Sequence, residues 1–368
     1  MKILFDFSPI KTGGGAQLAL NFIDYLKKNN TIFDYDILIS DKFPFFDRLP
    51  KKEIIISPSN YFKRMLFENT FLKKKIQKNR YTHIYTFFGP GLPCIKNVRQ
   101  VVSVAYPIIC YDDSIYWKKL SKKNYLRKKT INFFRKMRLK SADHLIFETE
   151  VMQKRCIIAL GLREGATTVI PPSPTLFLSD KRSPDKVSKI CKFLILSGLD
   201  QHKNISRLIE VVKRAHADKI LFKLVISCHK DSLFSEKIKN KHEISDFIIN
   251  NYFIFKGAIP PDSIQDIYDE VDVVMNISDL ESFSNNYMEA WRTGKPILAS
   301  DRDFSRHICG SSAIYCEPHD IDSLYGGIKK FIDKSVDIQY MIQCGKRYLA
   351  DLPDLDNRIQ KIKAVLFQ

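Results

Sequence analysis

The stretch that decides the fold is Asp272–Asp301, DVVMNISDLESFSNNYMEAWRTGKPILASD. Its apolar start predicts a buried strand at 272–278, and the segment 283–294 has a helical pattern that ends at a glycine. The residues 295–300, KPILAS, predict a second buried strand. A strand, a helix and a strand in this order indicate a parallel βαβ unit, with the polar loop before the helix at the carboxyl end of the first strand.

The same alternation runs through the chain in two blocks. Buried strands are expected at 2–7, 34–41, 53–57, 83–88, 101–106 and 144–148, and again at 192–197, 221–227, 252–257, 271–278, 296–300 and 313–317. We therefore predict an α/β protein with two doubly wound, Rossmann-like domains that face a central cleft. Their expected bounds are 1–170 for the first domain, 171–189 for a proline-rich linker, 190–350 for the second domain, and 351–368 for a C-terminal helix that packs back on the first domain.

Composition narrows the class of protein. A chain of 368 residues with 45% hydrophobic residues is long enough for two packed domains. No apolar run reaches the ~18 to 20 residues that a membrane-spanning helix needs. The eight cysteines are scattered without a C-x-x-C pair, which indicates buried, reduced thiols of a cytoplasmic protein and argues against a structural zinc site.

The positive charge is confined to one part of the chain. Between Lys51 and Lys140 there are 22 Lys and Arg residues against four acids, so this segment accounts for the whole formal net charge of +18. Charge concentrated in one region indicates one face with an anionic partner. Nucleic acid, an anionic membrane surface and a phosphorylated substrate all fit this observation.

The strongest basic run is Lys118–Lys140, KKLSKKNYLRKKTINFFRKMRLK, which has eleven Lys or Arg residues and no acid. Apolar residues are interleaved with the basic ones, so a helix here carries an apolar face and a basic face. Such a helix can lie in the headgroup region of an anionic membrane. The alternative is a domain helix whose apolar face is in the core and whose basic face is solvated. A second basic cluster, Lys73–Arg80, lies in the same predicted domain.

Two loops that follow predicted strands carry candidate ligand-binding residues. Gly13–Gly15 let the backbone approach a ligand closely, and the helix expected from Ala16 offers free amides to an anion. The spacing is neither G-x-G-x-x-G nor that of a P-loop, which disfavours a dinucleotide oxidoreductase or a P-loop enzyme. In the second block Lys203 directly precedes Asn204, a predicted N-cap. It can neutralise a phosphate at the helix start, or it is a solvated loop lysine.

The opening stretch contains the most specific candidates. The run Ser284–Asn286 is expected at a helix N-terminus, where amides and small polar side chains can bind a diphosphate. Glu289 can accept hydrogen bonds from a vicinal diol such as that of ribose. Glu281 can do the same for the hydroxyls of a sugar, or stabilise developing positive charge. The alternative is a surface helix with two unrelated acids.

The span Glu281-x7-Glu289, followed by AWRTGKPILASD, resembles the E-x7-E signature of the retaining family 4 glycosyltransferases, which have the GT-B fold. The residues 198–211, GLDQHKNISRLIEV, resemble the donor-phosphate loop of that family, with Lys203 at the family's lysine. The residues 13–21 resemble its amino-terminal glycine loop. There are two departures. Leu199 stands where the family often has an arginine, and Ala105 and Tyr106 stand where many members have a histidine.

The resemblance implies an enzyme of the hexosyltransferase type that moves a sugar from a nucleotide diphosphate donor, with retention and without a metal or other cofactor. Glu281 is then the catalytic residue at the donor sugar. The donor-binding residues would be Gly198, His202, Lys203, Ser284, Asn285, Asn286 and Glu289. Gly14, Gly15 and Gln17 would line the cleft from the first domain.

We expect the acceptor to be a lipid-linked saccharide in the synthesis of a cell-surface polysaccharide, such as the O-antigen of lipopolysaccharide. The protein would then be cytoplasmic and peripheral, on the anionic inner face of the cytoplasmic membrane. Two alternatives remain. One is a basic nucleic-acid-binding α/β protein, although no RNA- or DNA-reading motif is found, so no nucleic-acid partner is expected. The other is a GT-B sugar-nucleotide epimerase.

Overall fold

The computed structural model describes residues 1–11, 14–29, 34–50, 53–174, 178, 190–235, 238 and 241–368. The chain forms two compact units. The first unit consists of Met1–Asp113, Lys119–Ser173 and Pro353–Gln368, and the second of Ser114–Lys118 and Pro174–Leu352. Most of the predicted linker, 175–177 and 179–189, lies outside the described residues.

The first unit contains a seven-stranded parallel sheet in the order β3-β2-β1-β4-β5-β6-β7. Its strands are β1 (Lys2–Asp6), β2 (Asp34–Ser40), β3 (Ile54–Ser57), β4 (His83–Thr86), β5 (Arg99–Val104), β6 (His144–Phe147) and β7 (Thr167–Val169). The first six overlap the predicted strands. The seventh was not predicted as a strand, although its residues fall within the predicted first domain. β7 pairs with β6 over three residues only, and the prolines that follow it conceal the strand pattern.

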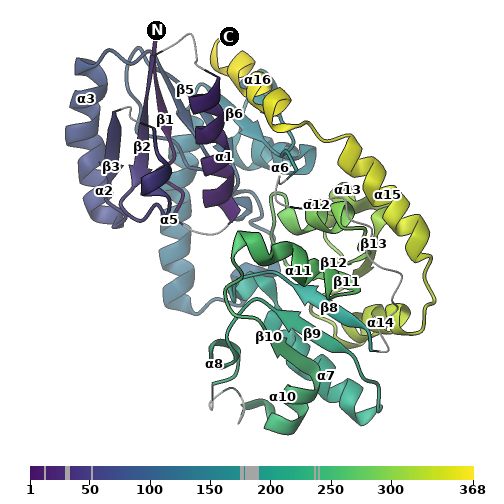
Figure 1. The fold of residues 1–368 in the computed structure, drawn as a ribbon. Helices are drawn as coiled ribbons and strands as arrows, with labels where there is room; N and C mark the ends of the chain where they lie inside the picture. Colours follow the sequence, from purple (N-terminus) through teal and green to yellow (C-terminus); the bar gives the residue numbers. More distant parts are fainter. Residues whose placement is uncertain are drawn as a thin grey trace. The chain divides into compact units, whose positions relative to one another are not determined.

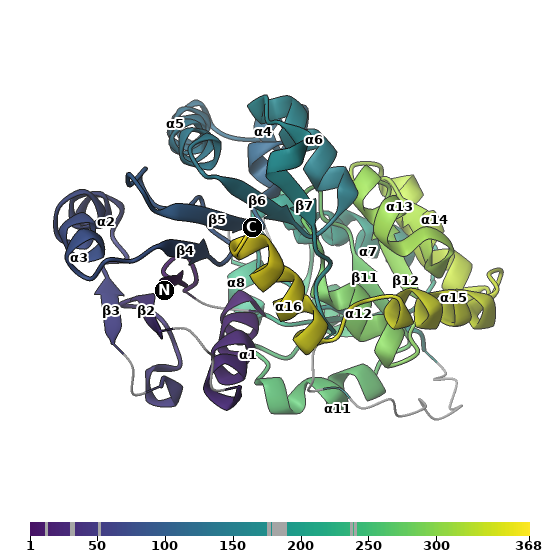
Figure 2. The ribbon, with the colours of Figure 1, turned by 90° about the horizontal axis from the view of Figure 1, so that it is seen from above.

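Helices cover both faces of this sheet. They are α1 (Gly14–Lys28), α2 (Tyr61–Phe67), a π-helical segment (Glu68–Leu72), α3 (Lys73–Lys78), α5 (Lys122–Lys140), α6 (Glu150–Leu160) and α16 (Leu355–Leu366). Figure 2 shows α1 and α16 on one face and α5 and α6 on the other. The strand side chains alternate between the two faces. Phe5 packs in the core that includes α1 and α16, whereas Leu4 packs in the core that includes Ile76 of α3.

The C-terminal helix belongs to the first unit, although it follows the second unit in the chain (Figure 1). Its side chains Ile359, Ile362 and Leu366 are buried in the same core as α1. Arg358 donates from Nη2 to Oε1 of Glu148 at 3.3 Å, and both side chains are almost fully buried. The last helix therefore closes one face of the first sheet.

The second unit contains a six-stranded parallel sheet in the order β10-β9-β8-β11-β12-β13. Its strands are β8 (Lys192–Ile195), β9 (Lys223–Ile226), β10 (Phe253–Phe255), β11 (Val273–Asn276), β12 (Ile297–Ser300) and β13 (Ala313–Cys316). Each overlaps a strand that the sequence predicts.

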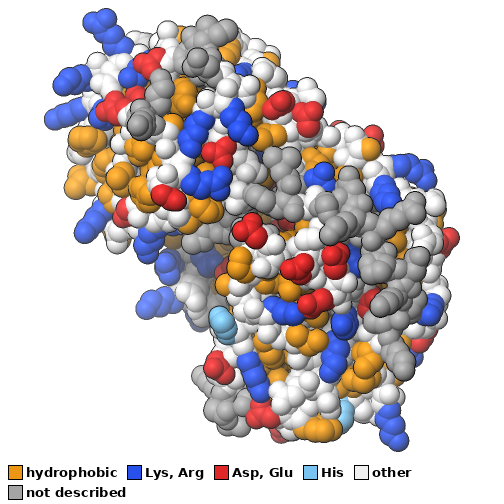
Figure 3. All heavy atoms as spheres, in the orientation of Figure 1, with side chains coloured by type: hydrophobic (Ala, Val, Ile, Leu, Met, Phe, Trp, Pro, Cys, Tyr) orange, Lys and Arg blue, Asp and Glu red, His pale blue; other side chains and the backbone are white. Residues whose placement is uncertain are grey.

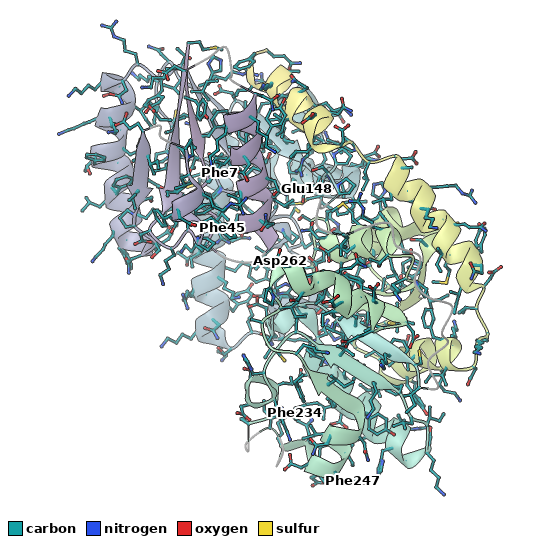
Figure 4. The ribbon with its side chains drawn as sticks, viewed as in Figure 1. Phe7, Phe45, Glu148, Phe234, Phe247 and Asp262 are labelled. Atoms are coloured by element: carbon teal, nitrogen blue, oxygen red, sulfur yellow. The ribbon has the colours of Figure 1, made fainter. Side chains whose placement is uncertain are left out.

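The helices of this unit are α4 (Ile115–Lys118), α7 (Leu208–Ala217), α8 (Lys230–Leu233), α10 (Asp246–Tyr252), α11 (Ile264–Asp269), α12 (Asn285–Arg292), α13 (Asp303–Cys309), α14 (Ile321–Ile332) and α15 (Ile338–Ala350). One core packs α7, α10 and α14 against the sheet, and another packs α11, α12 and α13. Phe7 and Phe234, which Figure 4 labels, lie in the main cores of the first and the second unit.

The strand order determines where each unit can bind a ligand. In the second sheet the order reverses between β8 and β11, and in the first between β1 and β4. At such a reversal the connections leave toward opposite sides, so the loops at the carboxyl ends of the two strands separate and leave room for a ligand. The predicted donor-site residues of the second unit lie at the reversal between β8 and β11.

The eight cysteines are all free, and those at 110, 156, 309, 316 and 344 are buried. No helix in the described part of the chain is both long and apolar enough to span a membrane.

Candidate functional site

The candidate site of the second unit consists of two loops. The loop after β8, Leu196–Asn204, and the loop after β11, Ile277–Ser284, both start at the carboxyl ends of neighbouring parallel strands. Because the strand order reverses here, the first loop leads to α7 and the second to α12 on opposite faces of the sheet.

Hydrogen bonds tie the two loops together. Asn204 has a left-handed backbone, with φ of 57°, which turns its side chain so that Nδ2 donates to the carbonyl of Ile277 at 3.0 Å. The amide of Asp279 donates to the carbonyl of His202 at 2.7 Å. The loops thus hold each other in place before any ligand arrives.

The structure brings together Lys203 and Glu281, which are 78 positions apart. Lys203 Nζ donates to Glu281 Oε1 at 2.6 Å, and the two side chains are 20% and 14% exposed. Burial alone would raise the pKa of Glu281, but the charge and the hydrogen bond of Lys203 lower it below its usual value. The site therefore contains a charged pair that is partly accessible to solvent.

The helix α12 begins at Asn285, with Ser284 in the N-cap position. The side chain of Ser284 forms no hydrogen bond to the first turn. Asn286 donates from Nδ2 to the carbonyl of Leu196 at 2.8 Å, which fixes the helix start beside the β8 loop. A helix start favours an anion, because its amides and its dipole both present positive charge.

Glu289 lies one turn further along α12 and is only 8% exposed. Tyr268 donates its hydroxyl to Oε2 of Glu289 at 2.8 Å, while Oε1 has no hydrogen-bond partner among the residues that the structure describes. Burial raises the pKa of Glu289, and the Tyr268 hydroxyl opposes that shift. The helix ends at Arg292, and Gly294 follows with a φ of 66°, which suits a residue without a side chain.

Sequence reasoning missed a buried polar network that supports the β11 loop. The Asp279 side chain is 1% exposed and accepts from Nη2 of Arg302 at 3.0 Å and from Nε2 of His319 at 2.8 Å. Arg302 also donates to both oxygens of Glu317, at 2.7 and 2.8 Å. Burial opposes ionisation of Asp279, but the hydrogen bond from His319 and the other polar contacts lower its pKa.

The members of this network come from the carboxyl ends of three neighbouring strands, β11, β12 and β13. Each lies close after a buried strand, and this shared position is the signal from which they could have been found. The sequence run Asp301–Asp303 resembles a metal-binding D-x-D. In the structure Asp301 forms an ion pair with Arg306 instead. Among the described residues, no group of three or more His, Cys, Asp or Glu side chains is placed to hold a metal ion.

The remaining predicted donor residues lie in the β8 loop. Gly198 lies near the start of this loop and is exposed, and His202 lies near Tyr116, with ring centroids 6.0 Å apart. His202 also contributes to the field that lowers the pKa of Glu281. The roles of both residues in donor binding stay predictions.

The residues predicted from the first domain form a separate group in the first unit. Gly14 and Gly15 lie in the first turn of α1, which begins two residues before the predicted start. Gln17 donates from Nε2 to Asn21 Oδ1 at 3.1 Å along the same helix. Gly13 lies outside the described residues. The structure does not test a role for these residues in a cleft.

Residues 179–348 match the family model of the glycosyl transferases group 1. A search of curated protein sequences finds no match.

Solved structures match over the full length. Sucrose-phosphate synthase from Thermosynechococcus elongatus has a TM-score of 0.73 and 16% identity, covering 99% of this chain and 98% of that chain. WaaG, a glycosyltransferase involved in lipopolysaccharide biosynthesis, has a TM-score of 0.72 and 12% identity, with both chains covered completely. HepE from Anabaena, in complex with UDP and glucose, has a TM-score of 0.66 and 18% identity, covering 100% of this chain and 99% of that chain.

The chain therefore has the GT-B fold, as the sequence predicts, and residues 179–348 of its second unit resemble the glycosyl transferases group 1. This match supports a glycosyltransferase. Membership of family 4 and the stereochemical course stay predictions.

The buried network gives a prediction about stability. Asp279→Asn removes one charge from the network, so we expect it to destabilise the second unit by about 2 kcal/mol near neutral pH. Because the folded-state pKa of Asp279 is lowered, its stabilisation is present above the usual value of 3.8 and is lost as the pH falls below it. Chemical denaturation of both proteins at several pH values measures this difference.

Asp301→Asn is the matched control, because its ion pair with Arg306 is about half exposed. We expect this variant to change stability by less than about 1 kcal/mol. Equal effects of the two substitutions would contradict the structural role given to the Asp279 network.

Proposed function

We propose that this protein transfers a sugar from a nucleotide diphosphate sugar to a lipid-linked saccharide, with retention of the anomeric configuration. The product would be part of a cell-surface polysaccharide such as lipopolysaccharide or its O-antigen. The observation that carries the proposal is the charged pair Lys203–Glu281 at the reversal of strand order, next to the start of α12.

The donor is supported by structural neighbours. HepE from Anabaena is known in complex with UDP and with UDP-glucose. In this chain, Lys203 and the first turn of α12 offer positive charge for a diphosphate, and the free oxygen of Glu289 can accept from a ribose hydroxyl. A uridine diphosphate sugar is therefore the first donor to test.

The same residues supply what the transfer needs. When the glycosidic C–O bond breaks, its electron pair leaves with the nucleoside diphosphate, and the added negative charge is stabilised by Lys203 and the helix start. Lys203 then interacts with the diphosphate as well as with Glu281. The Glu281 carboxylate can therefore turn to the donor sugar and stabilise positive charge at the anomeric carbon. The acceptor hydroxyl attacks on the face of the departing diphosphate and gives up its proton to it, which retains the configuration. This scheme uses no metal ion.

Attachment to a membrane is supported by the surface of the first unit. On α5 the apolar side chains Tyr125, Leu126, Phe133 and Met137 are exposed, with Leu126 at 69% and Phe133 at 59%. The alternative of a core-packed apolar face therefore does not describe most of this helix. The basic residues between them are drawn to anionic lipid, each with ~1 kcal/mol near the surface. Figure 3 shows a similar mixture of apolar and basic side chains at the edge where α2 and α3 lie.

Binding of the donor nucleotide is the first test. At about 100 times its Kd, a nucleoside diphosphate should stabilise the second unit by ~2.7 kcal/mol. Glu289→Gln should weaken its affinity about tenfold, since a charge-assisted hydrogen bond to the ribose is lost. The raised pKa of Glu289 means that its buried charge costs stability near neutral pH, so the ligand-free variant should be at least as stable as the wild type. Thermal unfolding with and without nucleotide measures both effects.

Glu270→Gln is the control for this substitution, because Glu270 is exposed and pairs with Lys256. It should leave the nucleotide effect unchanged. If no nucleoside diphosphate shifts the unfolding, or if Glu289→Gln keeps the full shift, the donor site is assigned wrongly. Transfer of a labelled sugar into a lipid extract then separates a transferase from an epimerase.

Membrane attachment is tested by sedimentation with vesicles. We expect binding to vesicles with anionic lipid at low salt, and loss of binding at high salt or when Lys122, Lys123, Arg127 and Lys128 are changed to Glu. The matched control changes four exposed lysines of the second unit, Lys219, Lys241, Lys334 and Lys346, to Glu. Docking through α5 would be ruled out if the protein bound anionic and neutral vesicles equally well. It would also be ruled out if both quadruple variants lost binding to the same extent.

A further inference from the structure

The first unit contains a pocket of about 190 Å³ that the donor site does not use. Its walls include Pro9 after β1, Pro90 after β4 and Tyr106 after β5, so it lies at the carboxyl edge of the first sheet. The remaining walls are Lys11 after β1, Ser59 before α2, Glu68 of the π-helical segment, and side chains of α2 and α5. This edge includes the reversal of strand order between β1 and β4, which is a favoured place for a ligand in a doubly wound sheet.

Two of the cations in the pocket wall share one buried acid. Glu68, in the π-helical segment, accepts from Arg64 at 2.6 Å and from Arg138 of α5 at 2.6 Å. The two guanidinium groups therefore face one carboxylate. Arg64 also interacts with buried Asp6, and burial raises the pKa of that carboxyl group. This cluster fixes α2 against α5 and positions the wall of the pocket.

Lys11 and Arg135 add two further positive charges without such neutralisation. Lys11 donates from Nζ to the carbonyl of Ser59 at 3.0 Å, and the guanidinium of Arg135 lies over the ring of Tyr106, 4.6 Å from its centroid. Neither side chain forms an ion pair with a carboxylate in the described part of the chain. Burial and the nearby positive charges of Arg64 and Lys42 lower the pKa of Lys11, while Asp41 acts in the opposite direction.

The pocket wall therefore has four cations and one acid. A structural role of the Arg64–Glu68–Arg138 cluster does not account for Lys11 or Arg135, because both lie outside it. A dianion such as phosphate or diphosphate would complement this excess of charge, and arginine is suited to bind it with two parallel hydrogen bonds.

The rim of the pocket is apolar and exposed. Tyr61 and Met65 of α2 and Phe134 of α5 line it, and each is between 44% and 47% exposed. Beside them Phe62 and Leu66 are 73% and 66% exposed. A cationic pocket with an apolar rim fits an amphiphilic ligand, whose anionic group enters the pocket and whose hydrocarbon part covers the rim.

We propose that this pocket binds the phosphate or diphosphate group of a lipid-linked acceptor, with Lys11 and Arg135 as the direct contacts and the lipid chain against Met65 and Phe134. The inference rests on the proposed function in that a lipid-linked acceptor is assumed there. It goes further by assigning the site and the charged group that it recognises.

The probes are geranyl diphosphate, which is a water-soluble isoprenoid diphosphate, and inorganic pyrophosphate. Calorimetric titration of the full chain should show tighter binding of geranyl diphosphate. The double variant Lys11→Ala/Arg135→Ala should weaken both probes by about tenfold for each cation removed. Met65→Ala/Phe134→Ala should weaken geranyl diphosphate and leave pyrophosphate unchanged.

Two controls separate this site from other effects. Lys73→Ala/Lys123→Ala removes the same charge from exposed positions of α3 and α5 and should leave both affinities unchanged. Lys203→Ala should weaken binding of a nucleoside diphosphate but not of geranyl diphosphate. The result for the pocket can thus be interpreted even if no nucleotide binds. If geranyl diphosphate does not bind in the pocket, the assignment of the donor site is not affected.

Several results would overturn the proposal. One is unchanged affinity of geranyl diphosphate in the Lys11→Ala/Arg135→Ala variant. Another is equal binding of pyrophosphate and geranyl diphosphate, which would indicate a site for free phosphate compounds. A third is binding of single-stranded RNA, abolished by the same double variant, without any binding of geranyl diphosphate.

Discussion

The candidate donor site depends on one constraint, the reversal of strand order between β8 and β11. Crossovers between parallel strands are right-handed. The sheet grows from β8 in one direction and from β11 in the other, so the connections that follow these two strands go to opposite faces of the sheet. The separated loops place Lys203 from one side against Glu281 from the other. The Asp279 network then holds the loop after β11 in place, through hydrogen bonds to residues that follow β12 and β13.

The Lys203–Glu281 pair links this architecture to chemistry. At 2.6 Å and with side chains that are only 20% and 14% exposed, the pair holds the two loops together. The pair is still partly accessible to solvent, so an anion with more than one negative charge can compete with the Glu281 carboxylate for the ammonium group of Lys203. We propose an exchange, in which the donor diphosphate takes the place of Glu281 beside Lys203 and leaves Glu281 free for the sugar. Such an exchange would couple donor binding to readiness for transfer without a metal ion.

Much of the fold could be predicted because buried parallel strands are short apolar runs with clear ends, as at 192–195 and 297–300. The strand at 167–169 could not, because three residues before a proline-rich segment give no periodicity. Lys203, Glu281 and Glu289 could be predicted from loop position and from resemblance. Asp279 and its partners could not, because Arg302 and His319 become neighbours only when three strands align in the sheet.

The sequence left open whether the apolar residues of Lys118–Lys140 are in the core or at the surface, and only the packing of α5 decides this question. Most of them are exposed, whereas Leu139 is buried. The pocket at the carboxyl edge of the first sheet was also beyond sequence reasoning. Its cations come from the β1 loop, α2 and α5, and the distribution of charge within the pocket depends on which of them Glu68 neutralises.

The most direct test of the exchange between Glu281 and the donor is to measure nucleoside diphosphate affinity and sugar transfer in parallel for Glu281→Gln. The substitution removes the negative charge that competes for Lys203 and changes the shape of the side chain little. The account predicts that the variant binds the nucleoside diphosphate at least as tightly as the wild type, while transfer falls by about a hundredfold or more. Weaker nucleotide binding together with unimpaired transfer would contradict it.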